Sequence, residues 1–288
     1  MIMKTNVKTG NFKVDEEFFK ELKDSPKEFQ EKANTKARIK MKNFRFSISE
    51  YYYWLKAEIG AGPAFNILVK SWIWDLVFNK PKWKPELFKI ENKTDGRIWK
   101  NAFNKDVVPL LTVYRNLLKR FGKERADQVM VRFIMPLGLQ YQFYCFKPIP
   151  NISHIDQFRQ QMADYLGEGK TMRNKVWVSK DGKEVRYYYT KCMHIQIMKA
   201  YGMEAAAQAS CMIDHVTFDK RIPTLKFKRT KTLSLGDSCC DHRFSIRDYG
   251  DNETPYDYYE DAHRCCFNAY NEILRLEDKF EKYGPKLR

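Results

Sequence analysis

The sequence predicts an α+β fold in which a helical N-terminal half packs with a C-terminal antiparallel sheet and a long C-terminal helix. Apolar residues recur at three- and four-residue spacing from Val14 to about Leu139, which indicates helices. Two alternating segments flank Asp181-Gly182, a dipeptide typical of tight hairpin turns. A helical pattern returns from Pro255 to about Tyr283, and we expect this last helix to lie over the sheet.

In the helical half, the apolar segment from Ala61 to Phe78 predicts a buried helix, and Pro63 suits its first turn. Lys70 and Asp75 interrupt the segment, which is also too short for a bilayer span. Two prolines in residues 79–85 then prevent the helix from continuing, so these residues are expected to form a loop.

Two further helices are expected before the sheet begins. The first runs from about Ile98 to Arg120 and ends near Gly122, and the second runs from Lys123 through Gln142. Pro148 and Pro150 close the helical part of the chain.

The second half begins with the predicted hairpin, whose strands are residues 174–179 and 184–190. One or two short helices are expected from Cys192 to about Ser210, around Gly202. The sequence then predicts three more strands, at Asp214–Phe218, Leu225–Leu233 and Cys239–Ile246.

The composition restricts the partners that we expect. The formal net charge is +16, but most basic residues are interspersed with acidic ones, and the run Lys226–Lys231 alternates like a strand with one solvated face. There is no reading helix, aromatic platform or finger spacing, so we expect no nucleic-acid partner, and no membrane partner either. The oligomeric state does not follow from the sequence.

The N-terminus, Met1 to Asn6, lacks the apolar region of a secretory signal, so we expect a cytoplasmic protein. Its seven cysteines should then be thiols, since an odd number without regular spacing argues against a disulfide framework.

Residues that can carry chemistry gather between Tyr187 and Phe244. A thiol close to an acid and a histidine can support nucleophilic catalysis, because a thiolate attacks sp² carbon and a nearby acid protonates the leaving atom. The same side chains could ligate zinc, or the cysteines could be small apolar core residues. The spacing of Cys211 to His215 and of Cys240 to His242 matches no standard zinc site, so we assign no metal and no cofactor.

The order of these residues resembles the L-2-amino-thiazoline-4-carboxylic acid hydrolase family over residues 98 to 246. The matching motifs are, in order, Tyr189-x-x-Cys192, Cys211-x-x-Asp214, and Arg229-Thr230-x-Thr232-Leu233-x-x-Gly236-Asp237-x-x-Cys240-Asp241-x-Arg243-Phe244. The resemblance divides the chain into a helical region of unknown function, residues 1–97, and a hydrolase-like α+β domain, residues 98–288, with its core motif at 187–246. The two could also form one continuous domain.

The resemblance implies an enzyme that opens a small cyclic amidine, the thiazoline ring of a cysteine precursor, with water. Attack on the ring carbon needs at least one thiolate and one carboxyl group. We expect Cys240 to be the nucleophile, with Cys211 as the alternative, and Asp214 or Asp237 to carry the proton. Cys192 and Asp241 complete the candidate catalytic set, although Asp241 could instead hold a turn and Asp237 could belong to the turn formed with Gly236.

The carboxylate of such a substrate would suit an arginine, whose planar guanidinium binds carboxylates bidentately. Arg229 and Arg243 are the candidates within the motif, and each has an alternative as an exposed strand residue. His242 departs from the family pattern, in which an aromatic residue such as phenylalanine is usual. From another functional class, the alternative is a small-molecule or metal-binding thiol sensor without turnover, which the neighbouring thiols Cys239 and Cys240 would suit.

Overall fold

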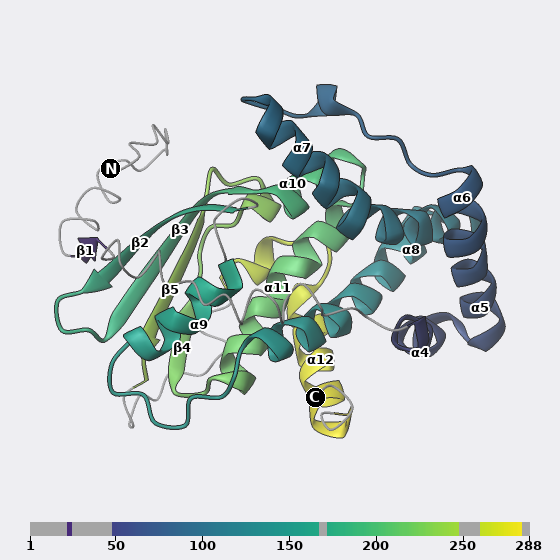
Figure 1. Cartoon of the computed structure of the whole chain (residues 1–288). Coiled ribbons are helices and arrows are strands. Elements are labelled where there is room, and N and C mark those ends of the chain that lie inside the picture. Colours follow the sequence, from purple (N-terminus) through teal and green to yellow (C-terminus); the bar gives the residue numbers. More distant parts are fainter. Residues whose placement is uncertain (1–21, 25–47, 167–171, 248–259, 284–288) are drawn as a thin grey trace.

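The computed structural model describes residues 22–24, 48–166, 172–247 and 260–283. They form an antiparallel sheet on one side of the molecule and helices on the other (Figure 1). The sheet has five strands in the order β1-β2-β3-β5-β4. A mixed α+β fold with an antiparallel C-terminal sheet was predicted and is confirmed.

The predicted hairpin is present. It joins β2 (Met172–Ser179) to β3 (Glu184–Cys192), with Val178 opposite Val185. Gly182 has a φ of 70°, a left-handed conformation that glycine adopts at little cost, and the Asp181 carboxylate accepts a hydrogen bond from the Lys183 amide. On the outer edge, β1 (Leu22–Asp24) pairs with β2 and lies within a stretch that was expected to be helical. At an edge strand, backbone pairing can override a helical pattern.

β5 (Cys240–Ile246) confirms the last predicted strand and lies between β3 and β4 (Leu225–Lys228). Tyr189 faces Cys240 in the β3–β5 register, and Phe227 faces Phe244 in the β4–β5 register. The prediction that β4 continues to Leu233 was wrong. The chain leaves the ladder after Lys228 and makes a short 3₁₀ turn, η4 (Leu233–Leu235), which is stabilised by the side chain of Thr232.

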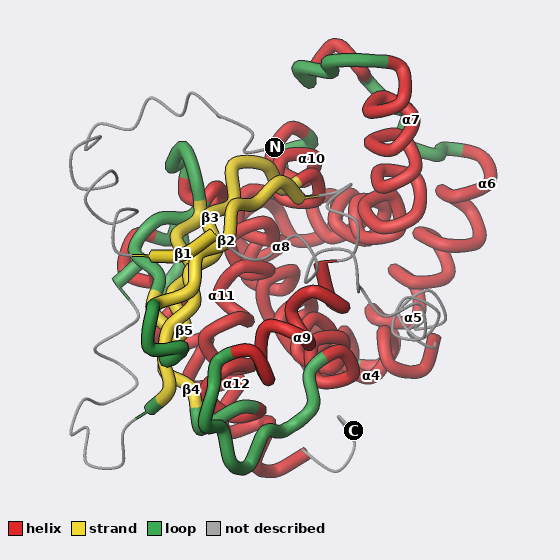
Figure 2. Tube along the Cα trace, turned by 60° about the vertical axis from the view of Figure 1, so that its left-hand side comes forward, coloured by secondary structure: helices red, strands yellow, loops and turns green. Residues whose placement is uncertain are grey.

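One face of the sheet is buried against two helices, α9 (Asp156–Leu166) and α11 (Glu204–Arg221) (Figure 2). Alternation along each strand places Tyr187 and Tyr189, and likewise Cys240 and Phe244, on this buried face. Cys239 instead packs with Trp177 and Tyr188 in a separate cluster, as expected for its neighbouring position in the chain. The helix-covered face therefore carries the side chains that meet those of α11.

α11 corrects the predicted strand at Asp214–Phe218, because these residues lie in the middle of the helix. Ile213, Val216, Thr217 and Phe218 are all buried. A short buried segment that contains β-branched residues has the same sequence pattern in a helix as in a strand, which explains the wrong prediction. α11 follows α10 (Met193–Ala200) after a break at Gly202, so the two helices predicted there are confirmed.

The long central helix α8 (Val108–Cys145) packs along α11. Gly122 interrupts it with a φ of 75°, at the position where one predicted helix ends and the next begins. The predicted helix from Ile98 begins earlier, in α7 (Lys93–Ala102), which the Asn92 side chain caps, and continues through a π-helical turn, η3 (Phe103–Val107).

At the far end from the sheet lie α4 (Ile48–Ile59), α5 (Ala61–Val69), the π-helical η1 (Lys70–Asp75) and α6 (Leu76–Phe78) (Figure 1). A helical segment from Ala61 to Phe78 is confirmed, but its expected burial is wrong. Ile67 and Leu68 are buried, whereas Trp74 and Phe78 are largely exposed, because the segment packs against α8 with one face only. A 3₁₀ turn, η2 (Pro85–Leu87), follows in the proline-containing loop.

Among the described residues, none of the helices is long and apolar enough to cross a membrane. One apolar cluster includes Trp54 of α4 together with Leu111 and Met130 of α8. The division of the chain at residue 97 stays a prediction.

The C-terminal helix is shorter than predicted, and it packs against α11 and α8 instead of lying over the sheet as expected. α12 is Ala269–Tyr283, 15 residues, and a 3₁₀ turn, η6 (Ala262–Arg264), precedes it. The Asn268 side chain accepts a hydrogen bond from the Asn271 amide at 3.1 Å, which fixes the start of α12, and the backbone is extended at Cys265. Residues 255–259 of the predicted helix lie outside the described residues.

Candidate active site

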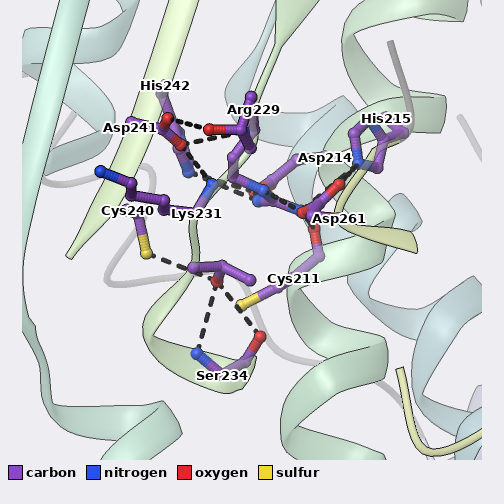
Figure 3. Close-up of polar contacts among 12 residues, drawn as sticks. Cys211, Asp214, His215, Arg229, Lys231, Ser234, Cys240, Asp241, His242 and Asp261 are labelled. Carbon is purple, nitrogen blue, oxygen red and sulfur yellow. Dashed lines mark hydrogen bonds and ion pairs between the residues drawn. The ribbon is translucent and has the colours of Figure 1, made fainter. Parts of the chain in front are cut away.

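Arg229 lies at the centre of a buried polar cluster between the sheet and α11 (Figure 3). Leu225 and Phe227 point to the helix-covered face of the sheet, and Arg229 continues their alternation just beyond β4. Its exposed fraction is only 1%, so the alternative of an exposed strand residue is wrong.

The guanidinium is held by three acceptors. Nε donates to Oδ2 of Asp261 at 2.5 Å, and Nη1 donates to Oδ2 of Asp214 at 2.7 Å. Nη2 donates to the backbone oxygen of Cys211 at 2.9 Å. Each of the three guanidinium nitrogens therefore already has an acceptor within the protein. We infer that the first role of Arg229 is to hold this cluster together, ahead of binding a ligand.

The helical conformation of α11 brings its polar residues to this cluster. Cys211, Asp214 and His215 are three and four positions apart, and residues with this spacing share one face of a helix. The His215 ring nitrogen Nε2 lies 2.7 Å from Oδ1 of Asp261, whose other oxygen binds Arg229. Asp261 thereby links the segment before η6 to both α11 and β4.

The two carboxylates differ electrostatically. For Asp214, burial raises the pKa above the ordinary value, although Arg229 and a 2.7 Å hydrogen bond from the Gln142 amide act in the opposite direction. For Asp261, burial also disfavours the charge, but Arg229 and His215 together outweigh it and lower the pKa. Of these two carboxyl groups, Asp214 is therefore the one better suited to carry a proton.

His242, two residues beyond Cys240 on β5, points into the same cluster (Figure 3). Its Nε2 lies 3.4 Å from Nη1 of Arg229, and its ring packs edge-on against Tyr189 and Phe227. Burial, followed by repulsion from Arg229, lowers its pKa well below the ordinary value. The imidazole is therefore neutral at physiological pH.

The two candidate nucleophiles both approach the segment from Thr232 to Ser234. The amide of Leu233 donates to Sγ of Cys240 at 3.2 Å, and this thiol lies 3.5 Å from Oγ1 of Thr232. The Cys211 thiol interacts with the hydroxyls of Thr232 and Ser234. Figure 3 shows the two sulfurs on either side of this segment.

Both thiols are protonated at rest. Burial is the largest effect on each, and it raises the pKa of Cys211 and, more strongly, that of Cys240. Arg229 opposes this effect at both sulfurs, because a nearby positive charge favours a thiolate. Cys192, at the junction of β3 and α10, has its pKa raised to about 12 by burial and then by Cys211.

Asp237 and Asp241 hold the loop between β4 and β5. Asp237 accepts from the Thr232 amide at 2.8 Å and pairs with Arg264 at 2.8 Å. Asp241 accepts from the amides of Thr230 and Lys231 at 3.0 and 2.6 Å. Both contacts fit the turn-forming alternative given for these two residues, and their catalytic assignment stays a prediction.

Arg243 lies apart from the cluster. It points to the opposite side of β5 from Cys240 and pairs with Glu184 at 2.6 Å, with 47% of its side chain exposed. Its role in substrate binding, like that of Arg229, stays a prediction.

Sequence reasoning missed two members of the cluster. Asp261 follows the motif region by some distance, and Gln142 belongs to a helix that otherwise reads as generic packing. No sequence spacing relates either residue to the motif, because only tertiary packing brings each of them to α11. Among the described residues, the structure has no group of three or more histidine, cysteine or acidic side chains placed to hold a metal ion.

A family model described as L-2-amino-thiazoline-4-carboxylic acid hydrolase matches residues 100–244, half of the chain. The chain belongs to this family. The resemblance predicted from the motifs is confirmed, and the match includes every predicted site residue. Membership implies a hydrolase that acts on a cyclic C–N bond of a small molecule. Comparisons with curated proteins and with solved structures gave no significant match.

Proposed function

We propose that this protein hydrolyses L-2-amino-thiazoline-4-carboxylate or a closely related cyclic amidine, with Cys240 as nucleophile and Asp214 as proton carrier. The observation that carries the proposal is the position of Arg229, which acts electrostatically on both thiols and donates directly to Asp214. The family match supports the reaction class, and the buried cluster supports the choice of residues.

The chemistry begins with transfer of the Cys240 proton to the Asp214 carboxylate. The thiolate then adds to the ring carbon that is bonded to sulfur and two nitrogens, and the ring C–N bond breaks while the departing nitrogen takes up a proton. Water next adds to the same carbon, and the Cys240 thiolate leaves. The net change is the addition of one water molecule, which gives a carbamoyl-cysteine.

Asp214 fits the role of proton carrier because burial raises its pKa. A carboxyl group with a raised pKa holds a proton more readily, so it can donate one to the departing nitrogen and accept one again in the second half of the reaction. Asp237 is the alternative, but its carboxylate already binds Arg264 and the Thr232 amide. Cys211 is the alternative nucleophile, and its less strongly raised pKa is the observation that favours it.

The test is turnover by the purified, reduced protein, with substrate loss and product formation followed by liquid chromatography and mass spectrometry. Cys240→Ser should lower kcat by at least about 100-fold, because a hydroxyl is a much weaker nucleophile than a thiolate. Cys266→Ser is the matched control, since Cys266 is exposed and lies outside the cluster. It should retain full activity.

If Cys240→Ser is fully active and Cys211→Ser is not, the nucleophile is Cys211. Full activity in both variants would remove thiol catalysis from the proposal. A wild-type protein that binds stoichiometric metal and turns over no substrate would instead support the thiol-sensor alternative.

We further infer that the helices from Ile48 onward fold together with the hydrolase region. The Trp54 indole donates to Oε1 of Gln140 at 3.3 Å, and both residues are buried. A chain that lacks residues 1–97 should therefore fail to give a cooperative thermal transition, whereas two independent domains would leave that transition intact.

A further inference from the structure

A cleft of 490 Å³ lies beside the candidate active site, lined by residues of the loop 87–91, of α7 and of the junction between β3 and α10. Phe88, Trp99 and Leu233 supply apolar surface, and the Phe88 and Trp99 rings are 5.0 Å apart. Leu233 connects the cleft with the candidate active site, because it lines the cleft and its amide donates to Sγ of Cys240. The volume suits a small organic molecule.

Two buried polar atoms on residues lining this cleft have no hydrogen-bond partner within the described part of the chain. They are Nε1 of Trp99, a donor, and the amide oxygen Oε1 of Gln196, an acceptor. Trp99 is 97% buried, since its exposed fraction is 3%. A buried polar group without a partner is destabilising, so one donor and one acceptor on residues lining the same cleft are candidates for hydrogen bonds to a ligand.

Two lysines of the cleft lining each lie beside an acidic partner. Nζ of Lys191 lies 5.0 Å from the centre of the Trp99 ring and 3.7 Å from Oδ2 of Asp95, and only 12% of its side chain is exposed. Nζ of Lys199 lies 3.0 Å from the backbone oxygen of Ser234 and 3.2 Å from Oε1 of Glu204. The Asp237 carboxylate in the lining is neutralised by Arg264.

We propose that this cleft binds the ring substrate as a small zwitterion. Its carboxylate lies near Lys191, Lys199 and the Trp99 N–H, its amidine N–H donates to Oε1 of Gln196, and its ring packs between Phe88 and Leu233. This inference rests on the proposed function for the identity of the ligand. It assigns substrate recognition to two lysines outside the motif arginines, whose guanidinium groups bind Asp214, Asp261 and Glu184.

The test is equilibrium binding, measured calorimetrically on the full-length protein with 2-aminothiazole-4-carboxylate, a flat, aromatic analogue of the substrate. Lys191→Gln should weaken binding about 10-fold, because a charge-assisted hydrogen bond is lost. Trp99→Phe keeps the aromatic surface but removes the N–H, and should weaken binding about 2- to 10-fold. Lys183→Gln, at the hairpin turn remote from the cleft, is the charge-matched control and should leave the Kd unchanged.

A second pair of ligands tests the amidine contact. Thiazole-4-carboxylate lacks the exocyclic amine, so it should bind the wild type about 2- to 10-fold more weakly than the amino compound. In Gln196→Leu the two ligands should bind equally, because the acceptor is absent. Thermal transitions of each variant show that loss of binding is not loss of folding.

Unchanged Kd values in Lys191→Gln, Trp99→Phe and Gln196→Leu would overturn the assignment of the cleft. So would turnover whose KM is unaffected in Lys191→Gln and Gln196→Leu. If these variants lose binding while the wild type turns over no thiazoline, the cleft assignment stands and the proposed function fails. The two failures are thus distinguishable.

Discussion

Nη1 of Arg229 lies 2.7 Å from Oδ2 of Asp214, while Nε of the same guanidinium lies 2.5 Å from Oδ2 of Asp261. The first carboxylate belongs to α11 and the second to the segment before η6, so one side chain joins the end of β4 to two other parts of the chain. The exposed fractions of the Arg229 and Asp261 side chains are both 0%. The cluster therefore connects three parts of the fold, in addition to being a candidate catalytic site.

Replacement of Arg229 should destabilise the protein strongly. Arg229→Met leaves two buried carboxylates without their counter-charge, and breaking a buried ion pair from one side costs about 3–5 kcal/mol of the free energy of unfolding. Urea denaturation measures this loss. Arg243→Gln is the control, because its partly exposed pair with Glu184 should contribute no more than about 1 kcal/mol. Equal losses in the two variants would contradict the central role of Arg229.

His242 should make the protein less stable on mild acidification. Its pKa in the fold is lowered, so its contribution to stability is complete above the unfolded pKa of about 6.5 and is lost as the pH falls towards the folded value. The slope reaches about 1.4 kcal/mol per pH unit. His242→Phe, which fits among the surrounding aromatic rings, should remove this slope below pH 6.5 in urea titrations.

The other buried acids serve as an internal check on this result. The lowered pKa of Asp261 predicts a further loss of stability below about pH 4, which His242→Phe retains. Asp214 acts in the opposite direction, because its raised pKa favours the protonated fold and its contribution is lost as the pH rises. An unchanged slope in His242→Phe would mean that the imidazole is accessible to protons in the folded protein.

Thiol reactivity should follow exposure and pKa. Iodoacetamide should modify the exposed Cys266 first, while the buried Cys211 and Cys240 react slowly, because burial raises their pKa and keeps them as thiols. Mass spectrometry of timed digests gives the order. For the same reason kcat should increase with pH across the neutral and alkaline range. Fast labelling of Cys240 at pH 7 would show that its sulfur is a thiolate already.

The packing of α8 against α11 should depend on Gly138. A Cβ atom at this position would collide with Cδ1 of Ile213, the flexible end of that side chain. Because Cδ1 can turn aside and alanine is favoured over glycine inside a helix, Gly138→Ala should reduce the free energy of unfolding by no more than about 1 kcal/mol. Ile213→Ala in the same chain should recover part of the loss if the collision is the cause. Strictly additive effects in a double-mutant cycle would contradict it.

Local signals explain what could be predicted. Asp181-Gly182 identified the hairpin, and Gly122 and Gly202 marked breaks between helices, because each is a short-range backbone requirement. The motif residues Cys211, Asp214, Arg229 and Cys240 were also found in sequence, and the structure brings them to one buried region.

What could not be predicted depends on tertiary packing. Residues 215–218 are all buried, so their pattern does not separate helix from strand. Only the helix places Asp214 and His215 on the same side as Cys211. Asp261 joins the cluster through contacts between distant segments, for which no spacing rule exists. The exposed face of Ala61–Phe78 was missed because an apolar segment does not reveal how many neighbours cover it.

Cys240 is the first residue of β5, and Cys239 directly precedes it. The two face opposite sides of the sheet, with Cys239 beside Trp177 and Tyr188 and Cys240 beside Leu233. Trivalent arsenicals bind two sulfur atoms at once, so both sulfurs must lie on the same side of the strand. While β5 is paired in the sheet, the two sulfurs cannot bind the same arsenic atom. Binding of an arsenical by both cysteines would therefore show that β5 has separated from the sheet.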